Sequence, residues 1–171
     1  MGIIKGSDMM LFCKEGTGTV KSIAQATNHT LNISADTVDI STKDIHRGEW
    51  KASEVNMLSW TASSENLVAD DAQGYNYSKL LQLMTSRTKI TGYFGLADTS
   101  KSTDGNVPSG GWINKSTDYM TGEMVITNLT LNAPNGDNAS FSVDFTGVGP
   151  LKPTSGAATF STKADEAKAS K

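Results

Sequence analysis

Alternating apolar and polar residues near the C-terminus constrain the fold of this 171-residue chain more than any other feature. Within residues 125–149 (VITNLTLNAPNGDNASFSVDFTGVG), apolar side chains recur at every second position on both sides of an Asn-Gly dipeptide. They are Val125, Leu129, Leu131 and Ala133 before it, and Phe141, Val143 and Phe145 after it. A period of two is typical of a strand with one buried face, and Asn-Gly favours a tight turn. These residues therefore predict a β-hairpin.

Two further segments, residues 29–40 (HTLNISADTVDI) and 54–67 (EVNMLSWTASSENL), show the same period over greater lengths. Each changes phase once, the first at Asp36-Thr37 and the second at Met57-Leu58. One extra residue in a strand turns every later side chain to the opposite face, so a β-bulge accounts for such a change. We therefore expect two long, paired strands that bend at their bulges.

Shorter strands are predicted elsewhere in the chain. Residues 8–14 and 20–26 flank a Gly-Thr-Gly turn and predict a short first hairpin. Residues 89–97 (KITGYFGLA) predict one more strand, with Ile90, Phe94 and Leu96 on the same side. The chain is therefore expected to be mostly β.

A single helix is predicted within residues 76–87 (NYSKLLQLMTSR). The spacing i, i+3, i+4, i+7 gives one apolar stripe that a helix would lay on a sheet. The stripe consists of Tyr77, Leu80, Leu81 and Met84. Asn76 or Ser78 is the expected N-terminal cap, because their side chains accept a hydrogen bond from a backbone amide of the first turn.

Two long connections join these elements. Residues 41–53 carry charges of both signs around Ile45 and Trp50, and residues 98–116 are rich in Gly and Ser around Trp112. Structureless segments of this length are usually functional or disordered in compact domains.

The C-terminal segment differs in composition from the rest of the chain. Among residues 152–171 the only large apolar side chain is Phe160, so this segment cannot supply a hydrophobic core. We expect one β-rich domain over residues 1–151, followed by a polar tail over residues 152–171 that is mobile unless it docks in an assembly.

The reactive side chains form no recognisable catalytic or metal-binding pattern. A net charge of −3 provides no basic excess for gripping nucleic acid. His29 and His46, the two histidines, have no Cys or Glu at the spacing of a zinc site and are expected to be ordinary polar surface. Cys13 lies in an apolar run and is expected to be a small core residue. We expect no enzyme activity, no catalytic residue, no bound metal and no cofactor.

Long strands also have edges, and unprotected edges pair with other chains. Several strands of this kind in one chain make self-association the physically motivated hypothesis.

Four sequence segments, taken in order, give the chain a family resemblance. They are GIIKGSDMMLF, SIAQATNHTLNISADTVDISTKD, GEWKASEV followed by LSWTASSENL, and ITNLTLNAPNGDNASFSVDFTGVGPL. Together with the short first hairpin, the one helix and the closing hairpin, they resemble the major tail tube proteins of long-tailed bacteriophages. The resemblance runs over residues 1–151. The connection at residues 98–116 and the C-terminal tail depart from it.

The resemblance implies a β-sandwich or barrel-like tail tube fold with one flanking helix. It also implies hexameric rings that stack into a hollow tube, in which long strands of all subunits close one β-barrel around the lumen. The implied partners are further copies of the chain, a tape-measure protein, tail terminator and initiator proteins, and DNA as a transient, non-specific cargo, with no membrane anchor. The implied location is the virion tail, assembled in the host bacterial cytoplasm.

For residues 41–53 the resemblance implies contact with a neighbouring subunit or the adjacent ring. Ile45 and Trp50 would be its apolar anchors, surrounded by a charged rim, which is a common distribution of interface energy. The rim consists of Lys43, Asp44, Arg47, Glu49 and Lys51. From the residues alone, an alternative stands beside it: Trp50 folds back onto its own sheet and the charges are solvated.

A conduit for DNA also needs a surface to which DNA does not adhere. Lys and Arg bind phosphates with release of counterions, so the lumen should be neutral or acidic. The polar phases of the long strands contain no basic residue and are candidates for the lumen, although an ordinary solvent-facing surface would look the same. The candidates are Asn32, Ser34, Asn128, Thr130, Asn132, Ser140, Ser142 and Asp144.

Two other functions remain open at the level of sequence. The tube protein of a contractile injection or secretion system would share the fold. A monomeric ligand-binding β-sandwich, such as a carbohydrate-binding module, would usually carry several exposed aromatic side chains on one sheet face. Trp50 and Trp112 lie in predicted loops and Trp60 in the apolar phase of a strand, which does not favour such a module.

Overall fold

The computed structural model describes residues 3–44, 49–70, 73–102 and 104–154. Within these ranges the chain is mostly β with a single α-helix, as expected. In chain order the elements are β1 (Met9–Glu15), β2 (Lys21–Ser22), β3 (Ala26–Asp39), β4 (Ser53–Leu67), α1 (Tyr77–Thr85), β5 (Ile90–Ala97), β6 (Asn114–Asn132) and β7 (Ser140–Thr154). Short 3-10 turns occur at Gly6–Asp8 and Thr99–Lys101.

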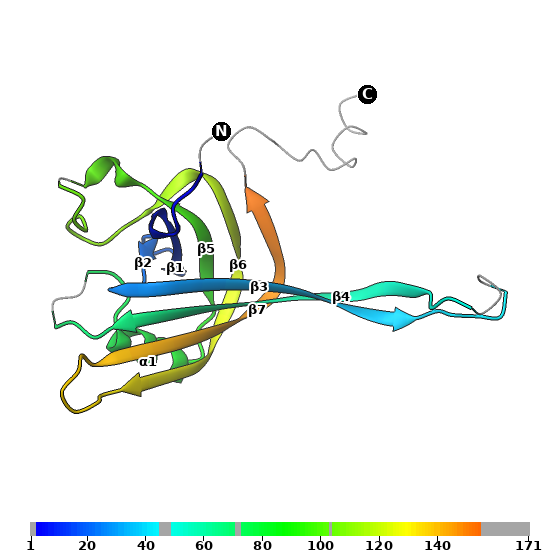
Figure 1. Ribbon diagram of the computed structural model, residues 1–171. Coiled ribbons are helices and arrows are strands. Elements are labelled where there is room, and N and C mark those ends of the chain that lie inside the picture. The colour runs from blue at the N-terminus through cyan, green and yellow to red at the C-terminus, as the bar shows by residue number, and fades with distance from the viewer. Residues whose placement is uncertain (1–2, 45–48, 71–72, 103, 155–171) are drawn as a thin grey trace, which may run out of the picture.

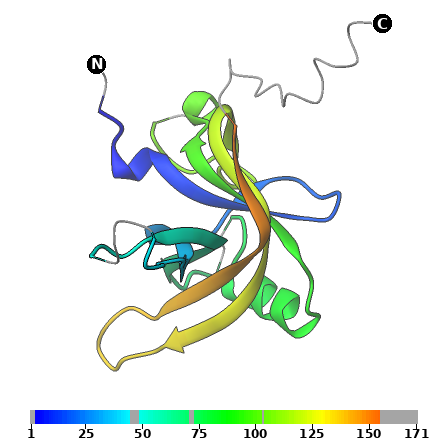
Figure 2. The same ribbon diagram turned by 90° about the vertical axis from the view of Figure 1, so that its right-hand side faces the viewer.

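All of these strands belong to one antiparallel sheet with the order β2-β1-β5-β6-β7-β4-β3 (Figure 1). The sheet curls (Figure 2). Its inner face encloses one apolar cluster to which both of its halves contribute. Leu80 and Leu83 of α1 belong to the same cluster, so the helix packs on the inner face. The layers expected of a sandwich are therefore the two halves of one continuous, barrel-like sheet.

The predicted C-terminal hairpin is present as β6 and β7. Its β7 side chains Phe141, Val143 and Phe145 are buried in the core, as expected. On β6, however, Thr127 is an extra residue between two paired positions, a bulge that the sequence pattern did not predict. The bulge reverses the expected phase of the residues that precede it, so Ile126 rather than Val125 lies in the core. Leu131 pairs with the buried Phe141 but is exposed instead of buried, because no strand covers this edge of β6.

Helix α1 confirms the predicted helix and its cap, since the Asn76 side chain accepts a hydrogen bond from the backbone amide of Lys79. The predicted apolar stripe is wrong at one position. Leu83 is buried beside Leu80, whereas Leu81 is 41% exposed. The helix is thus rotated on the sheet relative to the orientation expected from the stripe.

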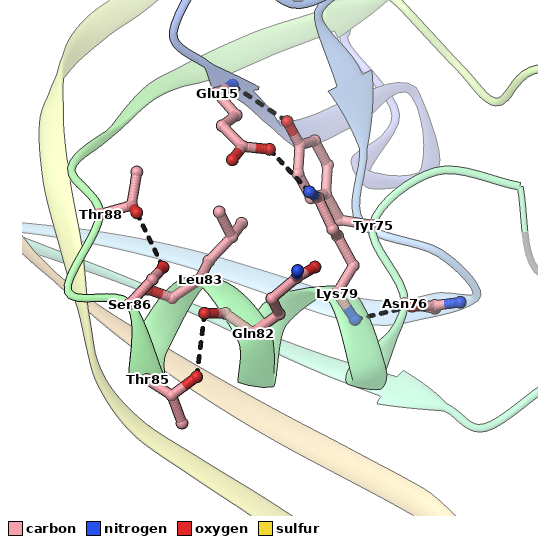
Figure 3. A network of polar contacts seen from close by, with 9 residues as sticks. All are labelled: Glu15, Tyr75, Asn76, Lys79, Gln82, Leu83, Thr85, Ser86 and Thr88. Carbon is pink, nitrogen blue, oxygen red and sulfur yellow. Dashed lines mark hydrogen bonds and ion pairs between the residues drawn. The ribbon is translucent and has the colours of Figure 1, made fainter.

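Polar contacts attach α1 to the first strand (Figure 3). The Lys79 ammonium lies 2.8 Å from a carboxylate oxygen of Glu15 at the end of β1. The Glu15 backbone amide donates to the Tyr75 hydroxyl at 3.1 Å. The residues of this network lie near the helix N-terminus and are half-exposed or buried. The network therefore fixes the position at which the helix begins on the sheet.

Two predicted boundaries change. The first hairpin is present, but β2 has only two residues and β3 already begins at Ala26. At the other end, β7 continues to Thr154, which pairs with Tyr119 of β6. Residues 152–154 of the predicted tail therefore belong to the sheet, and residues 155–171 lie outside the described residues.

Trp60 anchors β4 at the point where its pairing with β7 ends. Its indole nitrogen donates a 3.0 Å hydrogen bond to the Gly149 carbonyl oxygen, and the ring lies directly against the backbone of Gly122 and Gly147. A Cβ atom at Gly147 would overlap the indole ring, so only glycine allows this approach. The contact joins β4, β6 and β7 at the edge of the core.

We expect the substitution Gly147→Ala to destabilise the fold by about 1–3 kcal/mol, because the new methyl group has to displace the Trp60 ring. Chemical denaturation monitored by tryptophan fluorescence measures the free energy of unfolding. Gly6→Ala is the control, since a Cβ atom there meets nothing within 4 Å. Equal stability of the two variants would contradict the packing role of Gly147.

Candidate functional site

The most unusual surface of the molecule is a two-stranded projection. β4 pairs with β7 only over Thr61–Leu67, and beyond these residues β3 and β4 pair only with each other. They extend far past the sheet (Figure 1). We call residues 33–44 and 49–58 the arm. Half of the exposed large apolar residues in the described part of the chain lie on it: Ile33, Val38, Ile40, Trp50, Val55, Met57 and Leu58.

The arm is apolar on both faces. The bulge predicted in β4 is confirmed, because β4 has one extra residue where Ala35 pairs with Leu58 and Thr37 with Val55. β3 passes this point with regular alternation, so the bulge predicted at Asp36-Thr37 of β3 is wrong. Because β3 alternates regularly here, the change of phase in its sequence places its apolar side chains on one face before Asp36 and on the other face after it. Ile33, Val55 and Leu58 continue the core-facing side of the sheet, and Val38 and Ile40 lie on the opposite side.

Hydrogen bonds close the arm beyond its last strand pair. The Ser41 hydroxyl accepts from the Ala52 amide at 2.8 Å, and the Ile40 amide donates to the Ala52 carbonyl oxygen at 3.0 Å. Asp39 accepts a 2.8 Å hydrogen bond from the Ser41 amide and lies 3.9 Å from the Lys51 ammonium. The side-chain and backbone hydrogen bonds of Ser41 hold the pKa of Asp39 below its ordinary value.

Most of the residues predicted to form a contact loop lie at the arm's outer part. Trp50 is 73% exposed, so the alternative in which it folds back onto its own sheet is wrong. Four predicted rim residues are also exposed: Lys43, Asp44, Glu49 and Lys51. Ile45 and Arg47 lie outside the described residues.

The eight predicted polar positions share one face of the sheet. Asn32 and Ser34 of β3 pair with Thr61 and Ser59 of β4, and Thr61 pairs with Thr146 of β7. Directly paired residues of antiparallel strands lie on the same face, and the remaining six positions pair with one another across β6 and β7. These pairs are Asn128 with Asp144, Thr130 with Ser142 and Asn132 with Ser140. We call this surface, which lies opposite the core, the polar face.

The charges on the polar face are acidic. Glu65 pairs with Ser142, and Asp144 accepts a 3.0 Å hydrogen bond from the Asn128 side chain. This part of the polar face is formed by residues 28–34 of β3, 59–67 of β4, 128–132 of β6 and 140–146 of β7. No Lys or Arg occurs at the face positions of these segments. This surface therefore has little attraction for a polyanion.

The four long strands leave two free edges. Among the described residues, β3 is the last strand of the sheet and has a partner on one side only. β6 pairs with β5 only up to Met124, so its edge from Val125 to Asn132 has no strand partner on that side. The three antiparallel steps from β6 to β3 make these two edges run in opposite directions.

An apolar groove lies at the root of the arm. It encloses about 540 Å³ between the arm and the end of β7, and Trp60 contributes to its wall. Its other apolar lining residues are Ile33, Leu58, Met120, Pro150, Leu151 and Pro153. The groove continues the apolar surface of the arm toward the sheet.

His29 is not the ordinary surface residue that the sequence predicted. It lies on the core-facing side of β3, opposite Ser64, whose hydroxyl donates to the Asn66 side chain at 2.8 Å. Both ring nitrogens of His29 are buried and have no hydrogen-bond partner among the described residues. Burial lowers the pKa of His29 to about 4. His46 lies outside the described residues, and Cys13 is buried as expected.

Other kinds of site have little support in the described residues. No group of three or more His, Cys, Asp or Glu side chains is arranged there to hold a metal ion. The helices of this part of the chain are too short or too polar to cross a bilayer.

Comparisons with known proteins agree with this geometry. A family model described as "Phage tail tube protein" matches residues 3–153. The fold is similar to the tail of an empty gene transfer agent particle refined with C6 symmetry, with a TM-score of 0.65, 17% identity, and 90% of this chain and 100% of that one covered. A chain from the virion of a native gene transfer agent particle gives a TM-score of 0.63, 16% identity and the same coverages. The SPP1 tail tube gives 0.59 and 12%, over 92% of this chain and 82% of that one. The comparison with curated proteins finds no match.

The burial of His29 predicts a loss of stability in acid. A neutral buried histidine with its pKa lowered from 6.5 to about 4 binds its proton more weakly in the folded state than in the unfolded state. Stability is therefore lost as the pH falls from about 6.5 to about 4, and the loss at pH 5 is about 2 kcal/mol. Urea denaturation at pH 7 and pH 5 measures it. The control is His29→Gln, which lacks the titrating group, so its free energy of unfolding should fall by about 2 kcal/mol less than that of the wild type between pH 7 and pH 5. An equal fall in both proteins would contradict the buried neutral state of His29.

Proposed function

Because the chain belongs to the family of phage tail tube proteins, a family of structural virion components, we propose that it forms hexameric rings that stack into the tube of a phage tail. The C6 symmetry of the similar gene transfer agent tail supports six as the number of subunits.

The observation that carries the proposal is the pair of free edges. β3 of one copy can pair with the free half of β6 of the next copy, and their opposite directions make this pairing antiparallel. Each copy then contributes four strands, β6, β7, β4 and β3, to one closed sheet. A contact between two different surfaces generates a ring when its rotation closes. Closure removes both free edges, which otherwise invite irregular association.

The polar face would then line the lumen. It lies opposite the core on the same four strands, so if the subunit cores lie outside the closed sheet, this face points inward. Its hydroxyl, amide and carboxylate groups have no basic neighbour on the face, which lets a polyanion pass without counterion-releasing contacts. DNA is in this view a transient cargo rather than a ligand.

The remaining partners follow from the same role. A tape-measure protein would occupy the lumen before DNA, and terminator and initiator proteins would bind the last and first rings. Assembly would take place in the cytoplasm of the host bacterium. A ligand-binding module has no comparable support, because Trp60 is buried and Trp50 stands on the arm, so neither contributes to an aromatic platform on the sheet.

Purified protein should form rings or tubes with sixfold symmetry as its concentration rises, with or without a tail initiator complex, as seen by negative-stain electron microscopy. Amide hydrogen exchange then tests the edges. Residues 26–34 of β3 and 125–132 of β6 should become protected on assembly, because their free backbone groups gain partners. Residues 61–67 of β4, which already pair on both sides, are the control. Tubes whose β3 and β6 edges exchange as in the monomer would contradict closure through these strands.

The lumen assignment predicts a gain of DNA binding on charge reversal. Asp144→Lys tubes should retain a short DNA duplex at low salt and release it as salt rises, because each ring gains a set of phosphate contacts. Co-sedimentation with labelled duplex at several salt concentrations measures this. Asp137→Lys makes the same charge change in the β6–β7 turn, away from the polar face. Equal retention by the two variants would contradict an inward-facing Asp144.

A further inference from the structure

A second apolar surface lies at the end of the molecule opposite the arm. It is a notch of about 230 Å³, in which apolar side chains are joined by the polar residues Asp70, Asn76 and Ser78. Leu67, Val68 and Leu131 form its exposed part, and Tyr77 and Phe141 lie behind them in edge-to-face contact. Val68 is held in place by its backbone amide, which donates to the Ala139 carbonyl oxygen at 2.9 Å. The notch is thus built on ordered backbone.

The position of the notch relative to the arm follows from the strands. Leu67 ends β4, and Leu131 lies next to the end of β6. Figure 1 shows both strand ends at the side of the sheet from which the arm points away. Most of the exposed large apolar residues in the described part of the chain therefore lie at two opposite ends.

We propose that the arm of one copy inserts Trp50 into the notch of a copy in the adjacent ring. This inference rests on the proposed stacking of rings and identifies the surface that receives the arm. Rings stacked head to tail bring the arm end of one subunit against the notch end of another. The contact joins two different surfaces and does not close on itself, so it repeats along the tube without limit.

Size and chemistry favour Trp50 as the occupant. An apolar cavity of about 150 Å³ holds a benzene ring, so the notch has room for an indole. Trp50 is 73% exposed in the single chain and is the largest exposed apolar side chain of the arm. Tryptophan in an apolar pocket is a common centre of interface energy.

The charges beside the two surfaces are complementary. Asp70 lines the notch, and Lys51 follows Trp50 directly on the arm. The Lys51 ammonium lies 3.9 Å from Asp39 and is largely exposed, so it is available to a second carboxylate. A rim contact of this kind orients the arm more than it adds affinity.

Three variants separate stacking from ring formation. Trp50→Ala and Val68→Glu should each form rings but raise the critical concentration for tube elongation by about 30-fold, the factor for a hot-spot loss of about 2 kcal/mol. Val107→Glu is a matched control, because Val107 and Val68 are both 42% exposed and Val107 lies outside the notch. Circular dichroism confirms the fold of each variant, and electron microscopy distinguishes rings from tubes.

The outcomes are distinguishable. Rings without tubes for Trp50→Ala and Val68→Glu, with tubes for Val107→Glu, support the proposal. Normal tubes for Val68→Glu overturn it, and a block by Val107→Glu alone would place the receiving surface in loop 98–113 instead. Wild-type protein that forms neither rings nor tubes, even with an initiator complex, would refute the proposed function itself.

Cross-linking gives a direct measurement of the contact. A chain that keeps Trp50 and Val68 but carries Lys51→Cys and Asp70→Cys at the proposed rim contact, assembled and treated with a short bismaleimide, should give a ladder of covalent multimers that continues beyond six chains. The native Cys13 is fully buried, so wild-type tubes are the control and should not cross-link. A ladder that stops at six would place the contact within one ring, and no ladder from intact tubes would show that the two residues are not neighbours; either result overturns the proposal.

Discussion

Backbone hydrogen bonding at the edges of the long strands is the constraint on which the rest of this structure depends. β6 is an interior strand up to Met124, where β5 pairs with it, and an edge strand from Val125 onward. β3 is an edge along its whole length. The short strands β1, β2 and β5 complete the core without pairing with these edges. The chain therefore buries its apolar side chains as a monomer but leaves backbone donors and acceptors of two long strands for other molecules.

Like the strand edges, the apolar side chains of the arm lack partners within the chain. A two-stranded ribbon is marginal by itself, and this one carries apolar residues on both faces. Ile33 and Leu58 border the groove beside Trp60, while Val38 and Ile40 point to the other side. A monomer has no reason to keep such residues exposed, since their burial would stabilise it by about 25 cal/mol per Å² of apolar surface. Their exposure is understandable if the arm lies between other subunits, as we propose for the assembled tube.

The sequence predicted elements better than it predicted faces. Strands, the helix cap at Asn76, the C-terminal hairpin and the bulge in β4 follow from period and residue type, which are local properties. Three errors have one cause: Thr127 adds a bulge to β6, Leu81 points outward although it fits the stripe, and β3 has no extra residue at Asp36-Thr37 although its pattern shifts there. In each case the partner element decides the face, and a single strand or helix does not contain that information. The burial of His29 was missed for the same reason, because it depends on how β3 pairs with β4, where Ser64 lies opposite His29. The eight polar positions were grouped correctly because they alternate regularly on either side of the bulges.

A tube requires two contacts with different geometry from one chain. The lateral contact has to close after a fixed number of copies, and the longitudinal contact has to remain open so that the assembly grows. A hydrogen-bonded sheet suits the first, because twist and register fix the angle between neighbours. A single side chain in a pocket at the end of a long ribbon suits the second, because it holds rings together while tolerating small changes of tilt between them. The two contacts share only a few residues, Leu131 on the β6 edge and residues 33–34 on the β3 edge, and the rest of the arm and of the notch lie at opposite ends of the sheet. Bending of the tube would then strain the arm contacts between rings and leave the hydrogen-bonded β-barrel intact.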